Sequence, residues 1–341
     1  MRLRILTLAV LCSVLAIIPA SADAKVKVGI SENSPALFGD PLFTSLGVKQ
    51  LRIVVSWNAV AAAKAGDTEL TQKVGPYVTA AAAQGIDVLV SFEHARGDTH
   101  SCKSVKKGPA RCRLPSVAAY KSQVKQFLTL LPTVKTISPW NEANAGTQPT
   151  AKQPKRAGQY AKALDQVCKS LKRKCTNVVM DVLDTADNTH AKRLKYKKTG
   201  RFITKLRKAY GKKPSVCGIH NYADVNRFRT AGTKSLAKSM KCSHYWLTET
   251  GGIYKFGGFW KKAARKAGHC KSANDCQKKA MTYLFKKTVK ATKHIDRAYI
   301  FNFYRGTDGI HDYGITTGDG GFDASRFGKA RPAYNVFKAH I

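Results

Sequence analysis

Short apolar runs recur along the chain and have the character of buried parallel strands. Eight such runs are rich in β-branched or aromatic residues, and they span residues 26–30, 51–57, 86–92, 134–139, 177–183, 215–220, 244–249 and 298–304. The runs are almost continuously apolar, as expected of strands that are covered on both faces. The pattern therefore predicts eight parallel strands.

Segments with helical periodicity separate many of these runs. The clearest lies at residues 117–131, where Val117, Tyr120, Val124, Phe127, Leu128 and Leu131 share one face and Pro132 ends the helix. Further helices are expected at 71–84, at 153–174, around 202–210 and around 281–289. Strands that alternate with helices in this way predict an α/β fold, a single (β/α)8 TIM barrel. No linker, repeat or low-complexity tract in the sequence indicates a second domain.

The first 24 residues predict an export signal. Arg2 and Arg4 precede the apolar stretch 5–18, and Ala22-Asp23-Ala24 has the small-x-small pattern of a cleavage site. An uncleaved membrane anchor is the alternative, but the apolar stretch is short for a spanning helix. We therefore expect a signal peptide at 1–24, a barrel domain at 25–341, and a secreted or cell-wall-associated protein with no span after cleavage.

The cysteines agree with export. Cys12 lies within the signal, and the remaining eight form an even set, which in an exported chain predicts disulfides. Proximity along the chain suggests the pairs Cys102–Cys112, Cys168–Cys175, Cys217–Cys242 and Cys270–Cys276. A zinc site is the alternative, but no C-x-x-C or H-x-x-x-H spacing occurs, so we expect no metal and no other cofactor.

The chain is strongly basic along its whole length. It has 59 lysines and arginines against 21 acidic residues, which gives a formal net charge of +38. Such a charge attracts polyanions, including acidic or cell-wall glycans, although lysines on solvated helix faces are an equally good explanation. No zinc-finger, RNP or helix-turn-helix signature occurs, so nucleic acid is not expected as the primary partner. We expect a monomer whose partner is a carbohydrate.

Two glutamates far apart in the sequence lie at predicted strand ends. Glu142 follows the fourth predicted strand, and Glu249 ends the seventh. Because the carboxyl ends of the strands in a TIM barrel meet at one face, the two carboxylates can approach each other there. A pair of facing carboxylates is the arrangement that glycoside hydrolysis requires.

The sequence around these glutamates resembles that of the clan A glycoside hydrolases, which are retaining TIM-barrel enzymes that include cellulases, mannanases and β-xylosidases. Trp-Asn-Glu-Ala-Asn at 140–144 and Thr-Glu-Thr-Gly at 248–251 look like the paired signatures of the clan. The segment 51–57 is similar to its strand-two arginine segment, 220–222 to its H-x-Y motif, and 328–334 to the start of its closing helix. The resemblance therefore covers most of the chain after the signal.

The resemblance implies a role for each matching residue. Glu142 would be the general acid/base, and Glu249 would be the nucleophile that forms a glycosyl-enzyme, with retention of configuration. Asn141 would bond the sugar 2-hydroxyl. Arg52 and Tyr222 would hold Glu249, although Arg52 in a purely structural ion pair is the alternative.

Further residues at the strand ends complete the expected substrate site. His220 would bond near the acid/base, and His94 would contact substrate unless it only bonds backbone. Ala143 stands where relatives often have proline, and Tyr304 stands at strand eight where many relatives place a tryptophan platform for the sugar. Trp57, Trp140 and Trp260 are therefore the alternative stacking residues.

Two other functions fit the same residues. A non-catalytic, polycationic barrel that binds cell-wall or other polysaccharides would keep the site and lack turnover. A transglycosylase would use Glu142 and Glu249 in the same way and pass the glycosyl group to a sugar in place of water. The presence of both glutamates argues against the non-catalytic protein.

Overall fold

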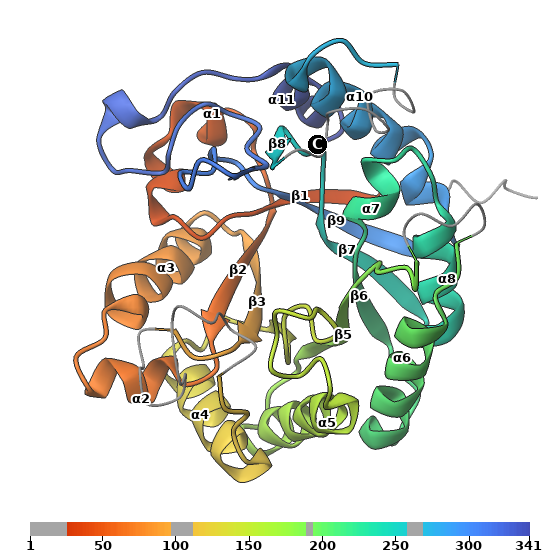
Figure 1. Ribbon diagram of the computed structural model, residues 1–341. Coiled ribbons are helices and arrows are strands. Elements are labelled where there is room, and N and C mark those ends of the chain that lie inside the picture. The colour runs from red at the N-terminus through yellow and green to blue at the C-terminus, as the bar shows by residue number, and fades with distance from the viewer. Residues whose placement is uncertain (1–25, 97–111, 189–193, 258–268) are drawn as a thin grey trace, which may run out of the picture.

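The computed structural model describes residues 26–96, 112–188, 194–257 and 269–341 and contains a closed barrel of eight parallel strands (Figure 1). The predicted TIM barrel is confirmed. The strands are β1 (Lys27–Ser31), β2 (Gln50–Ser56), β3 (Asp87–Glu93), β4 (Thr136–Ser138), β5 (Thr176–Leu183), β6 (Val216–His220), β7 (His244–Thr250) and β9 (Ile295–Phe301). The predicted signal peptide lies outside the described residues.

Strand order follows the chain, and β9 closes the barrel against β1 from Lys27↔Arg297 to Ser31↔Phe301. The last predicted strand extends too far, since β9 ends at Phe301. Beyond that residue the backbone leaves the barrel, because the carbonyls of Asn302 and Phe303 accept hydrogen bonds from the amides of Ile315 and Thr316.

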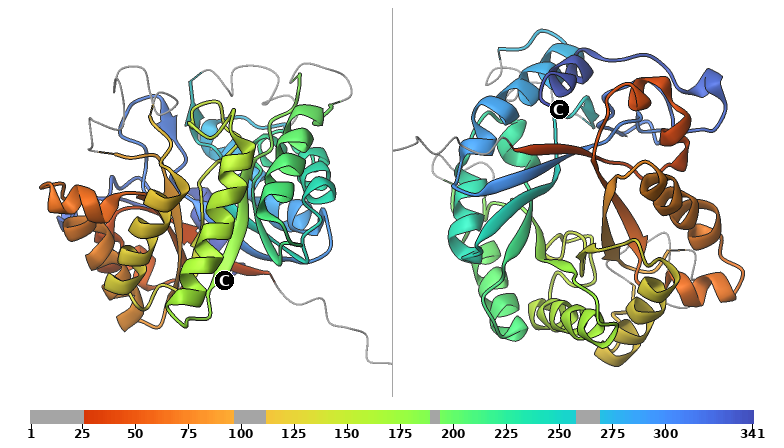
Figure 2. Two further views of the ribbon diagram at one scale, coloured as in Figure 1. Left: turned by 90° about the horizontal axis from the view of Figure 1, so that it is seen from below. Right: turned by 180° about the vertical axis from the view of Figure 1, so that it is seen from behind.

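Helices surround the barrel, as the views along and across its axis show (Figures 1 and 2). The helices are α1 (Pro41–Thr44), α2 (Ala59–Lys64), α3 (Gly75–Ala83), α4 (Val117–Leu130), α5 (Pro154–Ser170), α6 (Lys197–Tyr210), α7 (Tyr222–Val225), α8 (Ala231–Met240), α10 (Ala273–Lys286) and α11 (Pro332–Lys338). The helix predicted at 71–84 is divided into a π-helical turn at Glu69–Val74 and α3. No helix in the described part of the chain is long and apolar enough to cross a bilayer.

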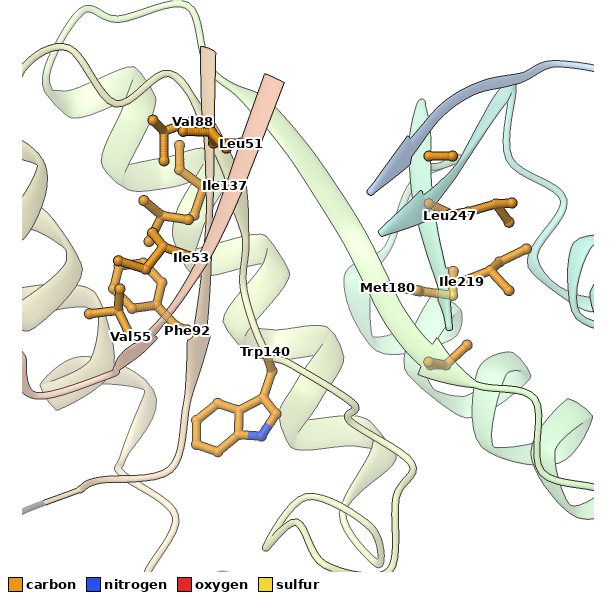
Figure 3. Packing of buried hydrophobic residues seen from close by; sticks show 14 of the residues in the cluster. Leu51, Ile53, Val55, Val88, Phe92, Ile137, Trp140, Met180, Ile219 and Leu247 are labelled. Atoms are coloured by element: carbon orange, nitrogen blue, oxygen red, sulfur yellow. The ribbon is translucent and has the colours of Figure 1, made fainter. Parts of the chain in front are cut away.

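The core lies mainly between the barrel and its helices. Alternate residues of β2, Leu51, Ile53 and Val55, face outward and pack with Phe92 and Ile137 (Figure 3). Because side chains alternate along a strand, the intervening residues of β2 face the barrel interior. A second apolar cluster, formed by Leu89, Val178, Val216, Trp246 and Tyr299, comprises buried residues from five of the strands.

A small antiparallel pair forms where the sequence indicates only loops. The strand β8 (Lys255–Phe256) follows β7, and it pairs with β10 (His311–Asp312), which follows β9. The loops after β7 and β9 are therefore tied together at the end of the barrel where the strands finish.

Three of the expected disulfides are present. They join Cys168 to Cys175, Cys217 to Cys242, and Cys270 to Cys276. The fourth expected pair includes Cys102, which lies outside the described residues. The second bridge connects β6 to the turn before β7 and fixes the start of both strands.

Candidate active site

Glu142 and Glu249 meet at the carboxyl end of the barrel. Glu249 lies in β7, and Glu142 lies four residues beyond the end of β4. Each offers one carboxylate oxygen, and His220 one ring nitrogen, such that the three atoms all lie within 4.8 Å of one another. The side chains of Glu142 and Glu249 are 21% and 12% exposed, so both are largely enclosed but reach solvent.

Backbone hydrogen bonds hold the turn that carries Glu142. The amide of Asn141 donates to the carbonyl of Phe92 in β3 at 2.6 Å, and the amide of Ala143 donates to the carbonyl of Asp181 in β5 at 3.0 Å. Glu142 itself has a φ of 45°, in the left-handed region that a glutamate seldom adopts. A residue kept in such a conformation by its surroundings is common at functional sites.

The carboxylate of Glu249 is held by two donors. Arg52 Nη1 donates to Oε2 at 2.8 Å, and the hydroxyl of Tyr222 donates to Oε1 at 2.9 Å. Burial and the charge of Glu249 raise the pKa of Tyr222 well above its ordinary value, so the phenol keeps its proton. A buried guanidinium and a phenol therefore both donate to this one carboxylate.

Glu142 has a different neighbour. Oε1 of Glu142 lies 3.1 Å from Nδ1 of His220, which also lies 3.8 Å from Oε2 of Glu249. His220 is therefore placed between the two glutamates. Among the described contacts, Arg52 and Tyr222 form hydrogen bonds with Glu249 and none with Glu142.

Asp181 lies beneath the glutamates at the centre of a buried polar network. Its Oδ1 is 2.8 Å from His220 Nε2, and its Oδ2 is 3.2 Å from Arg52 Nη2. The hydroxyls of Ser91, Ser138 and Thr248 also donate to this carboxylate. Burial opposes its ionisation, but the charges of His220 and Arg52 hold the pKa of Asp181 well below its ordinary value.

His220 is consequently an imidazolium at neutral pH. Burial alone would lower its pKa, but the carboxylates of Asp181 and Glu249 raise the pKa of His220 to about 10. Both ring nitrogens then carry protons, so Nε2 donates to Asp181 and Nδ1 donates to Glu142.

Gly218 in β6 makes room for this network. A Cβ atom at this position would lie 2.6 Å from Asp181 Oδ1 and 2.6 Å from Thr248 Oγ1. Such distances are too short for a methyl group, so only glycine allows Asp181 to occupy its place between the strands.

Asn141 joins the network to the end of β3. Its Oδ1 accepts from Arg52 Nη2 at 2.6 Å, and its Nδ2 donates to Glu93 Oε2 at 3.2 Å. His94 lies 3.7 Å from Glu93 and forms a hydrogen bond with the carbonyl of Ala95. Among the described residues, polar contacts connect His94 to Glu249 through Glu93, Asn141 and Arg52 in turn.

The prediction that Trp140 and Tyr304 contact the substrate is wrong. Trp140 is 1% exposed, donates from Nε1 to Gln148, and stacks on Tyr160 with a centroid distance of 5.2 Å, so its ring belongs to the core. Tyr304 is 2% exposed and packs edge-on against Phe303, because the chain has already left the barrel there.

The remaining tryptophans have different outcomes. Trp57 is partly buried and packs against the core, and its Nε1 has no hydrogen-bond partner in the described part of the protein, so a role in substrate contact stays a prediction. Trp260 lies outside the described residues.

Tyr313 is a site residue that the sequence analysis missed. Its ring packs on Tyr222 and on Phe301, with centroid distances of 5.3 Å in both cases. Burial and the charges of Glu249 and Glu142 raise the pKa of Tyr313, as expected for a phenol close to both carboxylates. The ring is half-buried and follows β10, so it places an aromatic surface beside the glutamates from a loop.

The same carboxylates and imidazole form a set of potential metal ligands. The imidazolium of His220 has no free lone pair, and Glu249 is already paired with the guanidinium of Arg52. The guanidinium of Arg52 thus places a positive charge beside these potential ligands.

No protein-family model matches the sequence, and no curated protein matches it significantly. Solved structures with a similar fold include a family 39 glycoside hydrolase from Bacteroides cellulosilyticus WH2, with a TM-score of 0.58, 16% identity, and coverage of 93% of this chain and 64% of that chain. A β-glucosidase from Thermotoga maritima gives a TM-score of 0.59 at 11% identity, over 87% of this chain and 83% of that one. A psychrophilic family 10 endo-β-1,4-xylanase gives a TM-score of 0.56 at 13% identity, over 92% of this chain and 96% of that one. The resemblance to clan A glycoside hydrolases is confirmed at the level of the fold.

Proposed function

We propose that this protein is an exported retaining glycoside hydrolase that cleaves β-linked O-glycosidic bonds in a poly- or oligosaccharide. The observation that carries the proposal is the approach of Glu142 and Glu249, whose oxygens lie within 4.8 Å at the carboxyl end of the barrel. Retaining enzymes hold their two carboxyl groups about 5–5.5 Å apart, whereas inverting enzymes need a wider gap for water. An oxygen of Glu142 within 4.8 Å of an oxygen of Glu249 leaves less room than the gap of an inverting enzyme, which supports double displacement.

The surroundings of Glu249 support its part in the division of roles. Arg52 and Tyr222 both donate hydrogen bonds to Glu249 and hold it in place, which suits a nucleophile that attacks the anomeric carbon. Glu142, the more exposed of the two, would give its proton to the departing oxygen and would later take a proton from the attacking water. Its own proton is thereby restored, and the reaction requires no cofactor.

The charges around the site suit the transition state of this reaction. Arg52, His220 and Asp181 are fully buried and fixed by mutual hydrogen bonds, so they need no rearrangement as charge develops. Asn141 Nδ2 has two hydrogens and shares one with Glu93, which leaves the other for a sugar 2-hydroxyl. Tyr313 would supply the aromatic surface that was expected from strand eight.

Chromogenic β-glycosides test the proposal directly. The parent protein should release the chromophore from at least one glycoside in a panel, and Glu249→Ala should abolish this release. Azide should restore turnover of Glu249→Ala and yield the glycosyl azide of inverted configuration. Glu69→Gln, which removes a carboxylate that pairs with Arg96, is the matched control and should leave turnover unchanged.

Glu142→Ala separates the acid/base from the nucleophile. This variant should lose roughly 100-fold or more in kcat/KM with poor leaving groups and much less with a dinitrophenolate, which needs no protonation. No hydrolysis of any glycan by the parent would support the non-catalytic binding protein. Oligosaccharides longer than the substrate among the products would show that a sugar accepts the intermediate in place of water.

A further inference from the structure

A basic hollow lies at the opposite end of the barrel from the glutamates. It has a volume of about 800 Å³ and is lined by the end of α6, the turn before β6 and the turn before β7. Five of its lining residues are cationic, namely Arg207, Lys208, Lys212, Lys213 and Lys241, and the others are uncharged. Because these turns precede the strands, the hollow belongs to the amino end of the barrel.

The hollow has a fixed framework. Cys242 lines it and is bonded to Cys217 in β6, so the turn before β7 cannot move away from the sheet. Gly211 and Lys241 both have left-handed backbone conformations that end α6 and α8. The cations therefore converge from rigid helix ends.

Most of these cations have no acidic partner. Lys212 pairs with Asp165 at 2.9 Å, whereas Lys208, Lys213 and Lys241 pair with no carboxylate in the described part of the chain. Helix dipoles favour cations at these ends by only about 0.3–1 kcal/mol each. That preference explains single lysines, but it does not explain a hollow lined by five cations of which one, Lys212, is paired with a carboxylate.

The positive charge extends over the whole amino end. Exposed lysines precede most of the other strands: Lys49 before β2, Lys135 before β4, Lys172 and Lys174 before β5, and Lys290 and Lys293 before β9. Asp87 and Asp296 lie at the starts of strands here, but they are already paired with Arg297 and His244. The lysines at this end consequently create a positive field that their acidic neighbours do not cancel.

We propose that this amino end is a second binding surface, centred on the hollow, for an acidic polysaccharide whose repeated carboxylate or phosphate groups pair with the lysines. The hollow contains no aromatic residue on which a nucleobase would stack and no large apolar side chain that would enter a bilayer. The choice of a glycan rests on the proposed function. The surface would hold the polymer while the opposite end of the barrel remains open to substrate.

Binding measurements with polygalacturonate test the surface independently of catalysis. The parent protein should bind this polymer at low ionic strength, bind uncharged dextran far less, and release polygalacturonate as salt is added. The triple variant Lys208→Gln, Lys213→Gln, Lys241→Gln should bind about tenfold more weakly and show a smaller salt dependence. Its turnover of a small neutral chromogenic glycoside should equal that of the parent.

A matched variant tests whether binding depends on the lysines of the hollow or on the net charge of the protein. Lys125→Gln, Lys155→Gln, Lys162→Gln removes the same charge from exposed positions on α4 and α5, and its affinity should stay within about twofold of the parent. Equal affinities for the two triple variants would overturn the proposal. Tighter binding of a DNA duplex or of phosphatidylglycerol vesicles than of polygalacturonate at equal salt would also overturn it. A protein that binds polygalacturonate through the hollow yet hydrolyses no glycoside would contradict the proposed function alone.

Discussion

Asp181 Oδ1 lies 2.8 Å from His220 Nε2, and both side chains are fully buried beneath the catalytic candidates. The pair links β5 to β6 and controls the charge of the group that contacts Glu142. Asp181 has no hydrogen bond to either glutamate among the described contacts, so it affects the position of Glu142 through His220 and Arg52.

Asp181→Asn should impair turnover by changing His220. The variant keeps the shape of the side chain and removes the charge that stabilises the imidazolium, so the pKa of His220 should fall from about 10 toward its ordinary value. We expect kcat/KM to fall by about 100-fold at neutral pH, because the proton that orients Glu142 is lost. The pH profile should also gain a new limb near the ordinary pKa of histidine. A lower kcat/KM with an unchanged profile would show that the effect is only structural, and Asp165→Asn on the outer face is the control.

His220 should cause the free energy of unfolding to decrease as the pH becomes alkaline. Its pKa in the folded protein is about 10, above the ordinary value of 6.5 in the unfolded chain, so its contribution is complete below about pH 6.5 and is lost as pH rises through 10. Urea unfolding between pH 6 and 10 should therefore show a decrease in the free energy of unfolding that is smaller in His220→Gln. Parallel curves for the two proteins would contradict the assignment.

Gly218→Ala should destabilise the protein. The added methyl would meet Asp181 Oδ1 and Thr248 Oγ1 at 2.6 Å, and the carbonyl of Met180 at 2.9 Å. We expect a loss of about 2–3 kcal/mol in the free energy of unfolding and a loss of turnover, because Asp181 must shift. Gly146→Ala has no atom within 4 Å of the new methyl and should change neither quantity.

Tyr313 should act through its ring and not through its hydroxyl. Tyr313→Ala removes the surface that packs on Tyr222 and Phe301, so KM for a glycoside should rise and kcat should fall with it. Tyr313→Phe should keep most of the activity. Steady-state kinetics on both variants test this prediction. Equal losses of activity in Tyr313→Ala and Tyr313→Phe would show that the hydroxyl is the group that matters.

Much of the fold could be predicted because its signals are local. Each barrel strand carries its own apolar run. The helix α4 carries a regular apolar face and is capped by Ser116, whose Oγ accepts a hydrogen bond from the amide of Ala119. The prediction that the last strand continues to Tyr304 is wrong, since hydrogen bonds from residues 315 and 316 draw the chain out of the barrel after Phe301. Apolar character alone does not reveal where such pairing begins.

The candidate site was predictable in part. Glu142, Glu249, His220 and Tyr222 lie at the ends of predicted strands, which a barrel brings together. The resemblance to the clan A glycoside hydrolases added Arg52 and implied the role of each residue. Asp181 left a signal in the sequence, as a single carboxylate within the apolar run of β5, where a buried charge requires partners. Tyr313 left none, because it lies in an irregular loop whose path depends on the pairing of β8 with β10.

By itself the sequence determined the barrel, its helices, three of the cysteine pairings and the strand-end carboxylates, since each depends on local patterning or short separation. Only the tertiary structure decided that Trp140 and Tyr304 are core residues, that Asp181 keeps His220 charged, and that Glu142 adopts a strained φ. These features depend on how close distant side chains come, which no spacing along the chain specifies. The direction of a side chain after a strand ends is set by the packing that surrounds it.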